Sequence, residues 1–275
     1  MCSTDARPTG FRAPIADVTK GGLETGPWVS YVLDMYRIAA LILLLFALPL
    51  RADEALVAVA ANFLKPAEVL AVAFTEETGH TIALASGSTG QHYAQILHGA
   101  PYDAFLAADG ERPMLLAAQG VAQDPITYAI GRLAYVSNVP FMPDTWQAAA
   151  ANVRLLAIAN PDLAPYGRAA HEALTAVNLW DEQRTVQGQN VGQAFALVAS
   201  GNVEGGLVAA SMARGHDGDT ALVSADLHAP ILQDAVLLTR AKGNLAAKGF
   251  LTYLGSEAAL AVIESFGYDR PDTVE

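Results

Sequence analysis

The sequence predicts an α/β protein of two lobes, each a mostly parallel sheet flanked by helices. From residue 54 onward, short apolar runs alternate with amphipathic segments of helical length, which is typical of βαβ units. A proline-rich stretch around Pro140 and Pro143 interrupts this alternation once and suggests a lobe boundary. Apolar residues make up 52% of the 275-residue chain, which is sufficient for two packed cores.

The first 52 residues stand apart from this pattern. Arg37 precedes an apolar run of 13 residues over 38–50, and Ala52 follows it, an arrangement typical of a cleaved signal peptide. A membrane anchor is the alternative, but the run is shorter than the roughly 20 residues that a spanning helix needs. We therefore predict a secretory signal peptide at 35–52 and export of the mature chain. Residues 1–34 are either a leader or a wrongly assigned start.

The first lobe begins with a strand at 55–61. A helix should follow with Pro66 near its start, with Val69, Val72 and Ala73 on its inner face, and with Gly79 as its C-terminal stop. The other elements predicted here are a strand at 81–85, a helix to about residue 98, and strands at 103–108 and 132–137 that continue the same sheet.

The second alternation begins after the prolines. Its predicted elements are strands at 155–160, 184–188 and 205–210, with helices at 168–177 and 190–200. A late strand at 232–240 and helices at 245–254 and 257–266 complete the chain.

Four strand-to-helix junctions are candidates for a ligand site. In parallel α/β sheets ligands bind beyond the carboxyl ends of the strands, where helices present unpaired N–H groups. The junctions contain Asn62, then Ser88 and Thr89 in "SGSTG", Tyr166 in "APYG", and Val191 in "QNVGQ". Each feature also has an ordinary interpretation as a helix cap, a tight turn or an interface aromatic.

In "SGSTG", we expect Gly87 and Gly90 to allow close backbone approach to a ligand and a positive φ, while the two hydroxyl groups donate hydrogen bonds.

Other polar residues carry weaker signals. Asp103 and Asp109 lie at opposite ends of one strand, and we interpret them as a solvated carboxylate and a helix cap. His92 and His98 are six residues apart on one helix, which favours a surface position for both. Arg168 is expected to be solvated or salt-bridged.

Several function classes lack support. Cys2, the only cysteine, lies in the excluded leader, and no short-spaced histidine pair is present, so the sequence predicts no soft-metal site. The nucleophile loop G-x-S-x-G and the common nucleotide-binding loops are absent.

The exported chain is strongly acidic. Residues 1–52 hold five Lys/Arg and four Asp/Glu, so their removal leaves 11 Lys/Arg, 24 Asp/Glu and a net charge of −13. Such a chain is a poor partner for nucleic acid or anionic lipid.

At these four junctions the sequence resembles the periplasmic molybdate-binding proteins of ABC transporters. The similar segments run along the exported chain and include "VAVAANF", "SGSTGQHYAQILHGAPYDAFLAAD", "ANPDLAPYGRAA", "NVGQAFALVASG" and "GGLVAASMA". The resemblance implies a two-lobed type II periplasmic binding-protein fold with both chain ends in one lobe. Lobe I is then expected at 53–137 and 233–275, and lobe II at 138–232.

The resemblance also implies what the protein does. It implies a receptor without enzymatic activity or cofactor, which delivers molybdate or tungstate to a membrane permease. We expect a monomer. A receptor for sulfate or another oxyanion is an alternative. A secreted hydrolase that uses Ser88 or Thr89 is an alternative of another class.

The resemblance further implies which residues bind the oxyanion. These are Asn62 with the N–H near Ala61, Ser88 with Thr89, Tyr166, and the backbone N–H of Val191. Some members of the family have a tyrosine where this chain has Ala209, and we therefore exclude Ala209 from the site.

Overall fold

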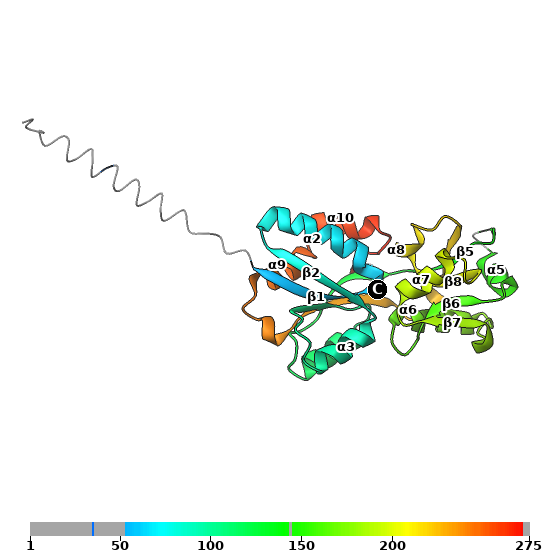
Figure 1. Ribbon diagram of the computed structural model, residues 1–275, viewed down its shortest axis with the longest axis horizontal. Helices are drawn as coiled ribbons and strands as arrows, with labels where there is room; N and C mark the ends of the chain where they lie inside the picture. The colour runs from blue at the N-terminus through cyan, green and yellow to red at the C-terminus, as the bar shows by residue number, and fades with distance from the viewer. Residues whose placement is uncertain (1–34, 36–52, 143–144, 272–275) are drawn as a thin grey trace, which may run out of the picture. The chain divides into compact units, whose positions relative to one another are not determined.

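The computed structural model describes residues 35, 53–142 and 145–271. Residues 52–275 form one compact unit, and Figure 1 labels many of its helices and strands. The predicted leader at 1–34 and the predicted signal peptide, apart from Met35, lie outside the described residues. Within the described part of the chain, no helix is both long and apolar enough to cross a membrane.

The unit contains two five-stranded sheets of the same design. Their strand orders are β2-β1-β3-β10-β4 and β7-β6-β8-β5-β9. In each sheet one strand, β10 or β5, runs antiparallel to both neighbours, while the other four strands share a direction. We call the first sheet with its helices lobe I and the second lobe II. The predicted α/β class is confirmed.

The strands of lobe I are β1 (Glu54–Ala60), β2 (Thr81–Gly87), β3 (Ala104–Leu106), β4 (Ile126–Gly131) and β10 (Ile231–Leu237). Those of lobe II are β5 (Leu133–Ser137), β6 (Leu156–Ala159), β7 (Thr185–Gly188), β8 (Gly205–Ala209) and β9 (Asp219–Leu222).

The helices that precede β5 or follow β10 are η1 (Ala61–Phe63), α2 (Leu64–Thr78), α3 (Thr89–Leu97), α4 (Glu111–Ala118), η5 (Thr239–Ala241), α9 (Leu245–Tyr253) and α10 (Glu257–Ser265). Those between β5 and β10 are α5 (Trp146–Asn152), α6 (Pro165–Ala176), η3 (Glu182–Arg184), α7 (Val191–Ala199), α8 (Ala210–Ala213) and η4 (Ala225–Leu227).

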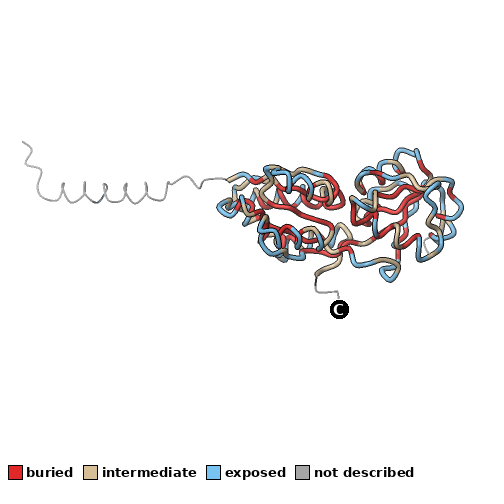
Figure 2. The backbone as a smooth tube through the Cα atoms, turned by 90° about the horizontal axis from the view of Figure 1, so that it is seen from below, coloured by how far each residue is buried: buried red, intermediate tan, exposed pale blue. Residues whose placement is uncertain are grey.

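Strand β1 is buried on both faces of its sheet. Successive side chains of a strand point to opposite faces, so the packing of neighbouring residues shows what covers each face. Val57 and Val59 pack in the same cluster as Leu70 of α2, whereas Ala58 packs in a second cluster with Phe105. Helices therefore cover both faces of this sheet, as parallel sheets require. In Figure 2 buried backbone runs through the interior of both lobes, and exposed segments lie mainly on the outside.

Helix α2 turns a different face to the core than the sequence predicts. Val69 and Val72 are 46% and 60% exposed, whereas Leu70 and Phe74 are buried. Spacings of three and of four residues both place side chains on one face of a helix, but Leu and Phe remove more apolar area from water than Val does. The predicted stop is confirmed, since Gly79 caps the helix with a φ of +75°.

The strand predicted at 132–137 was assigned to the wrong sheet. β5 pairs with β8 and β9 of lobe II, so it does not continue the sheet of lobe I. Only Arg132 separates β5 from β4, a strand that was not predicted from the sequence. The prolines at 140 and 143 follow β5, so they do not mark the passage between the sheets. The chain returns to lobe I between β9 and β10.

Candidate functional site

The four predicted junctions surround one small cavity between the lobes. η1 and α3 of lobe I begin at this cavity, and so do α6 and α7 of lobe II. The residues that line it include all six predicted site residues, Ala61, Asn62, Ser88, Thr89, Tyr166 and Val191. The structure thus brings together residues that are as far apart as 130 positions in the sequence.

The cavity accepts only a compact ligand. Its volume is about 10 Å³, and about 10–15 Å³ is needed to hold one water molecule. A sugar, a peptide or a nucleotide would not fit between lobes held this closely. A small inorganic ion is the ligand class nearest to this size, and because a tetrahedral oxyanion is larger than one water molecule, the groups that line the cavity would move apart to admit it.

Helix N-termini supply N–H groups at the cavity. The first residues of a helix have no intrahelical acceptor for their N–H groups, and the helix dipole places positive potential there. Ala61, Thr89 and Val191 each stand first in their helix. Pro165 opens α6 and has no N–H, so Tyr166 supplies the first N–H of that helix. Together these ends form a site of the kind that binds anions.

The hydroxyl groups of Ser88 and Thr89 are held as donors. Ser88 Oγ accepts from the N–H of Gln91 at 3.2 Å, and Gln91 Oε1 accepts from the N–H of Ser88 at 3.1 Å, forming a capping box. Thr89 Oγ1 accepts from the N–H of Ala108 at 3.0 Å. Each oxygen already accepts one N–H, and its hydroxyl proton remains available to donate to a ligand.

Two of the predicted residues have other hydrogen-bond partners. Asn62 Nδ2 donates to Gln233 Oε1 at 2.7 Å and to the Tyr268 hydroxyl at 3.0 Å. The hydroxyl of Tyr166 is hydrogen-bonded to that of Tyr268, and burial holds the pKa of Tyr166 well above its usual value. The backbone N–H groups of Asn62 and Tyr166 are therefore the donors that these residues can offer to a ligand.

The lining is electrically neutral. Among the described residues that line the cavity, none carries a charged side chain. An anion there would be bound by N–H and O–H dipoles rather than by an arginine or lysine. Hydrogen bonds to a charged group contribute about 1.5–3 kcal/mol each, so several converging donors compensate for the missing cation.

Polar contacts join the two lobes beside the cavity. The N–H of Gly90 donates to Leu163 O at 2.9 Å, and Gln91 Nε2 donates to Gln189 Oε1 at 2.7 Å. Arg112 forms an ion pair with Asp109 and donates to Asp162 O at 3.0 Å. These contacts hold the lobes in a closed arrangement over the cavity.

The two glycines of "SGSTG" have a different role from the predicted one. Neither Gly87 nor Gly90 has a positive φ. A Cβ on Gly90 would come within 2.8 Å of Leu163 O, and one on Gly87 within 2.9 Å of His92 Nε2. Small size at Gly90 therefore makes room for the opposite lobe.

The expectation for His92 was wrong. His92 is 2% exposed, with Nε2 3.2 Å from Val59 O and Nδ1 3.2 Å from Gln95 Oε1. Desolvation lowers its pKa. Both ring nitrogens thus contact groups other than Ser88. The described residues Ser88 and His92 therefore do not form the Ser–His pair that a hydrolase needs.

The remaining weak candidates behave largely as expected. Asp109 accepts from the N–H of Arg112 at 3.1 Å near the start of α4, and Arg168 pairs with Glu111 at 3.2 Å on the surface. Asp103 is not merely solvated, because it accepts from Leu56 N at 2.8 Å and pairs with Arg240. No group of three or more potential metal ligands occurs among the described residues.

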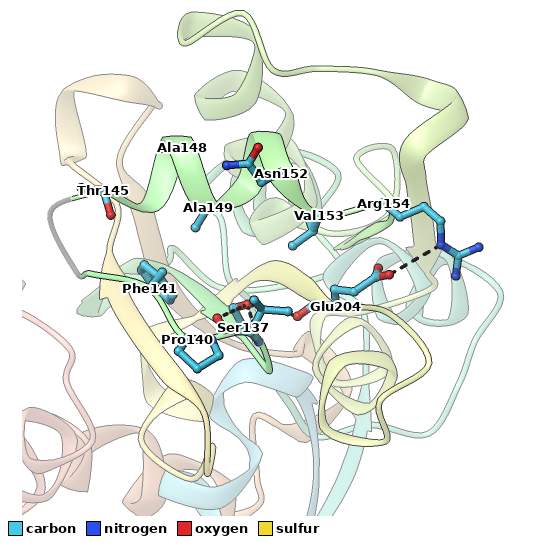
Figure 3. A pocket seen from close by; sticks show the side chains of 11 residues that line it. Ser137, Pro140, Phe141, Thr145, Ala148, Ala149, Asn152, Val153, Arg154 and Glu204 are labelled. Carbon is cyan, nitrogen blue, oxygen red and sulfur yellow. Dashed lines mark hydrogen bonds and ion pairs between the residues drawn. The ribbon is translucent and has the colours of Figure 1, made fainter.

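A larger groove of about 430 Å³ lies on lobe II. Figure 3 shows Glu204 and Arg154 at one end of it, and Phe141, Pro140 and Val153 along it. Glu204 pairs with Arg154 at 3.6 Å and accepts from Leu155 N. A carboxylate in the lining disfavours an anion in this groove. The neutral cavity between the lobes is therefore the better candidate site.

Known proteins share this fold and much of the sequence. The family model described as bacterial extracellular solute-binding protein matches residues 55–269. The molybdate-binding protein of Rhodobacter capsulatus is 41% identical over 228 residues, which cover 81% of this chain and 90% of that protein. The molybdate-binding protein of Azotobacter vinelandii is 40% identical over 234 residues, covering 82% and 93%.

A solved structure agrees with these sequence matches. The periplasmic molybdate-binding protein of A. vinelandii matches with a TM-score of 0.75 at 37% identity, over 79% of this chain and 99% of that chain. These relatives are named as binding proteins and not as enzymes. The chain belongs to the bacterial extracellular solute-binding protein family.

Proposed function

We propose that this chain is the periplasmic substrate-binding component of a molybdate ABC transporter. In this proposal the two lobes close on molybdate or tungstate, and the closed protein delivers it to a membrane permease. The observation that carries the proposal is the small neutral cavity at four helix N-termini. The relatives named as molybdate-binding proteins support the choice of ligand.

The proposed ligand contacts are the residues predicted from the sequence. We propose that the N–H groups of Ala61, Asn62, Tyr166 and Val191, together with Ser88 and Thr89, surround the four oxygens of the dianion. Because these donors are distributed over both lobes, a bound dianion would hold the lobes together. Molybdate and tungstate have the same charge and shape, so this arrangement accepts both.

The donor set disfavours phosphate. Near neutral pH phosphate retains a proton that needs an acceptor, and an unsatisfied buried group is costly. The side-chain oxygens of Ser88, Thr89 and Asn190 each already accept one backbone N–H, and no carboxylate of the described residues lines the cavity, so only the second lone pairs of these neutral oxygens remain as side-chain acceptors for that proton. Sulfate has no such proton, so discrimination against sulfate would depend on the size of the cavity.

Export follows from the proposed role. We propose that the signal peptide at 35–52 is cleaved and that the mature chain begins near Asp53. N-terminal sequencing of the secreted protein tests this, and a start at Met1 with the apolar run retained would contradict it. We further propose that the mature protein is a monomer, which light scattering would test.

Thermal unfolding with different oxyanions tests the ligand. A ligand that binds only the folded state at a hundredfold excess over its Kd stabilises that state by about 2.7 kcal/mol. For a protein of this size the midpoint should rise by about 5–11 °C. We expect a rise of this order with micromolar molybdate or tungstate and almost none with phosphate, at one ionic strength.

The other outcomes distinguish the alternatives. A rise with sulfate equal to that with molybdate would indicate a general oxyanion receptor. The absence of a rise with all four anions would contradict the proposal, because a site shared by two lobes stabilises the fold when it is filled. Hydrolysis of a generic ester by the protein would support the enzyme alternative.

A further inference from the structure

A buried hydrogen-bond network adjoins the cavity through Asn62, which lines it. The Tyr268 hydroxyl accepts from Asn62 Nδ2 at 3.0 Å and lies 2.8 Å from Asn62 O. Ser211 Oγ donates to Asn62 O at 3.0 Å and lies 3.2 Å from the Tyr268 hydroxyl. Asn62, Gln233 and Tyr268 are all at most 3% exposed.

The network determines the orientation of the Asn62 amide. Gln233 Nε2 donates to the carbonyl groups of Ile231 and Leu232 at 3.1 and 3.4 Å, so its Oε1 must face Asn62 as an acceptor. Both Asn62 amide protons then point toward Gln233 and Tyr268. The side chain of Asn62 therefore holds the first anion-binding turn in place, and its backbone N–H remains for the ligand.

The same network connects the two lobes. Tyr268 follows α10, and the adjacent Asp269 forms a bridge with Ile130 of β4 in lobe I. Ser211 lies in α8 of lobe II. The bonds from Ser211 to Asn62 and Tyr268 cross from lobe II to lobe I, whereas the bonds between Asn62 and Tyr268 lie within lobe I.

We propose that Tyr268 is a positioning residue, which orients the Asn62 turn for the oxyanion and binds Ser211 of lobe II when the lobes close. The inference rests on the proposed function. If binding requires the closed form, apparent affinity falls by the same factor as the closed fraction. Removing the Tyr268 hydroxyl would therefore weaken binding although Tyr268 never touches the ligand.

The test compares Tyr268→Phe with Tyr128→Phe in the full-length protein. Tyr128 is also buried and also packs edge-on against Phe63, at 4.8 Å between ring centroids against 5.4 Å for Tyr268. Its hydroxyl has no hydrogen-bond partner among the described residues, so it is a matched control. We expect Tyr268→Phe to raise the Kd for molybdate and its dissociation rate roughly tenfold, and Tyr128→Phe to change neither.

Ser211→Ala separates positioning from general stability. In the proposed role these bonds of Ser211 form on closure, so the Kd should rise severalfold while the unfolding midpoint of the ligand-free protein stays constant. If the substitution only weakened the fold, it would lower the unfolding midpoint. The Kd measured at 25 °C, well below that midpoint, would then be unchanged.

Two results would contradict this inference in different ways. Wild-type affinity in both Tyr268→Phe and Ser211→Ala would overturn the role of Tyr268 and leave the proposed function intact. If neither the wild-type protein nor Tyr128→Phe binds molybdate, the proposed function is overturned, and the inference with it.

Discussion

Gly90 limits how closely the lobes can approach each other. Its N–H donates to Leu163 O of the opposite lobe, and there is no space for a Cβ between them. Because Gly90 lies within α3 and has no positive φ, a side chain would cause no strain within lobe I. The glycine is therefore required by closure and not by the local backbone.

Gly90→Ala should thus separate stability from affinity. Alanine is a better helix former by up to about 1 kcal/mol, so the midpoint of the ligand-free protein should stay constant or rise. The Kd for molybdate should rise at least tenfold, because the methyl group pushes the backbone of Leu163 away. Calorimetric titration measures this, and Gly243→Ala, where a Cβ meets no described atom within 4 Å, is the control. Unchanged affinity in Gly90→Ala would mean that the ligand-bound lobes are farther apart.

Thr89 provides a second test at the residue scale. In Thr89→Asp the carboxylate can still accept from Ala108 N, as Thr89 Oγ1 does at 3.0 Å, so the fold should survive. Its negative charge would stand against the dianion in a site without a compensating cation, and binding should fall below detection. Thr89→Ser keeps the hydroxyl and should bind within a few-fold of wild type. Normal molybdate binding by Thr89→Asp would exclude this turn from the site.

At the scale of elements, the lobes are joined by contacts of unequal strength. The Arg112 side chain is 12% exposed and bonded to both Asp109 and Asp162 O. The Arg168–Glu111 pair has side chains that are 45% and 59% exposed. Exposed ion pairs contribute little, because water screens the charges and two long side chains must be ordered.

Arg112→Gln should therefore increase the ligand dissociation rate by roughly three- to tenfold, corresponding to about 0.7–1.4 kcal/mol lost from the closed form. Arg168→Gln should leave this rate nearly unchanged. Stopped-flow displacement of molybdate by excess tungstate would measure both rates. Equal effects of the two substitutions would show that burial of Arg112 does not strengthen its contact.

The elements also show what the sequence could predict. Strands such as β1 and helices such as α10 have strong periodicity and clear caps, and they appear near their predicted positions. The assignment of β5 failed because pairing between distant strands depends on register and not on local composition. The four junctions were found because helix N-termini follow local rules. The Asn62–Gln233–Tyr268 network was not, since its members are up to 206 positions apart and no local pattern links them.

For the whole molecule, buried tyrosines make stability depend on alkaline pH. Burial raises the pKa of Tyr268 to about 12 and that of Tyr128 and Tyr166 well above the usual 10. The folded state then retains protons that the unfolded state loses above pH 10. This contribution is complete below about pH 10 and disappears as the pH rises through the folded-state values.

We therefore expect the free energy of unfolding to fall between pH 10 and 12, by up to about 1.4 kcal/mol per pH unit for each such tyrosine. Urea unfolding at pH 8, 10 and 11.5 measures this dependence, and tyrosinate absorbance follows the ionisation. Tyr128→Phe should make the decline less steep by one tyrosine. A constant free energy up to pH 11.5 would show that these hydroxyl groups are accessible to hydroxide in the native state.

The strand order also determines where lobe II could be deleted from the chain. Gly131 ends β4 and is paired directly with Ile231, which begins β10, while everything between them belongs to the other lobe or to the passages that lead to it. Lobe II is thus an insertion within the tip of an antiparallel hairpin. A two-residue Asn-Gly connection, which such hairpins favour, could replace the whole insertion and leave the pairing of β4 with β10 in register. Lobe I would then become a single continuous domain with half of an anion site on its surface.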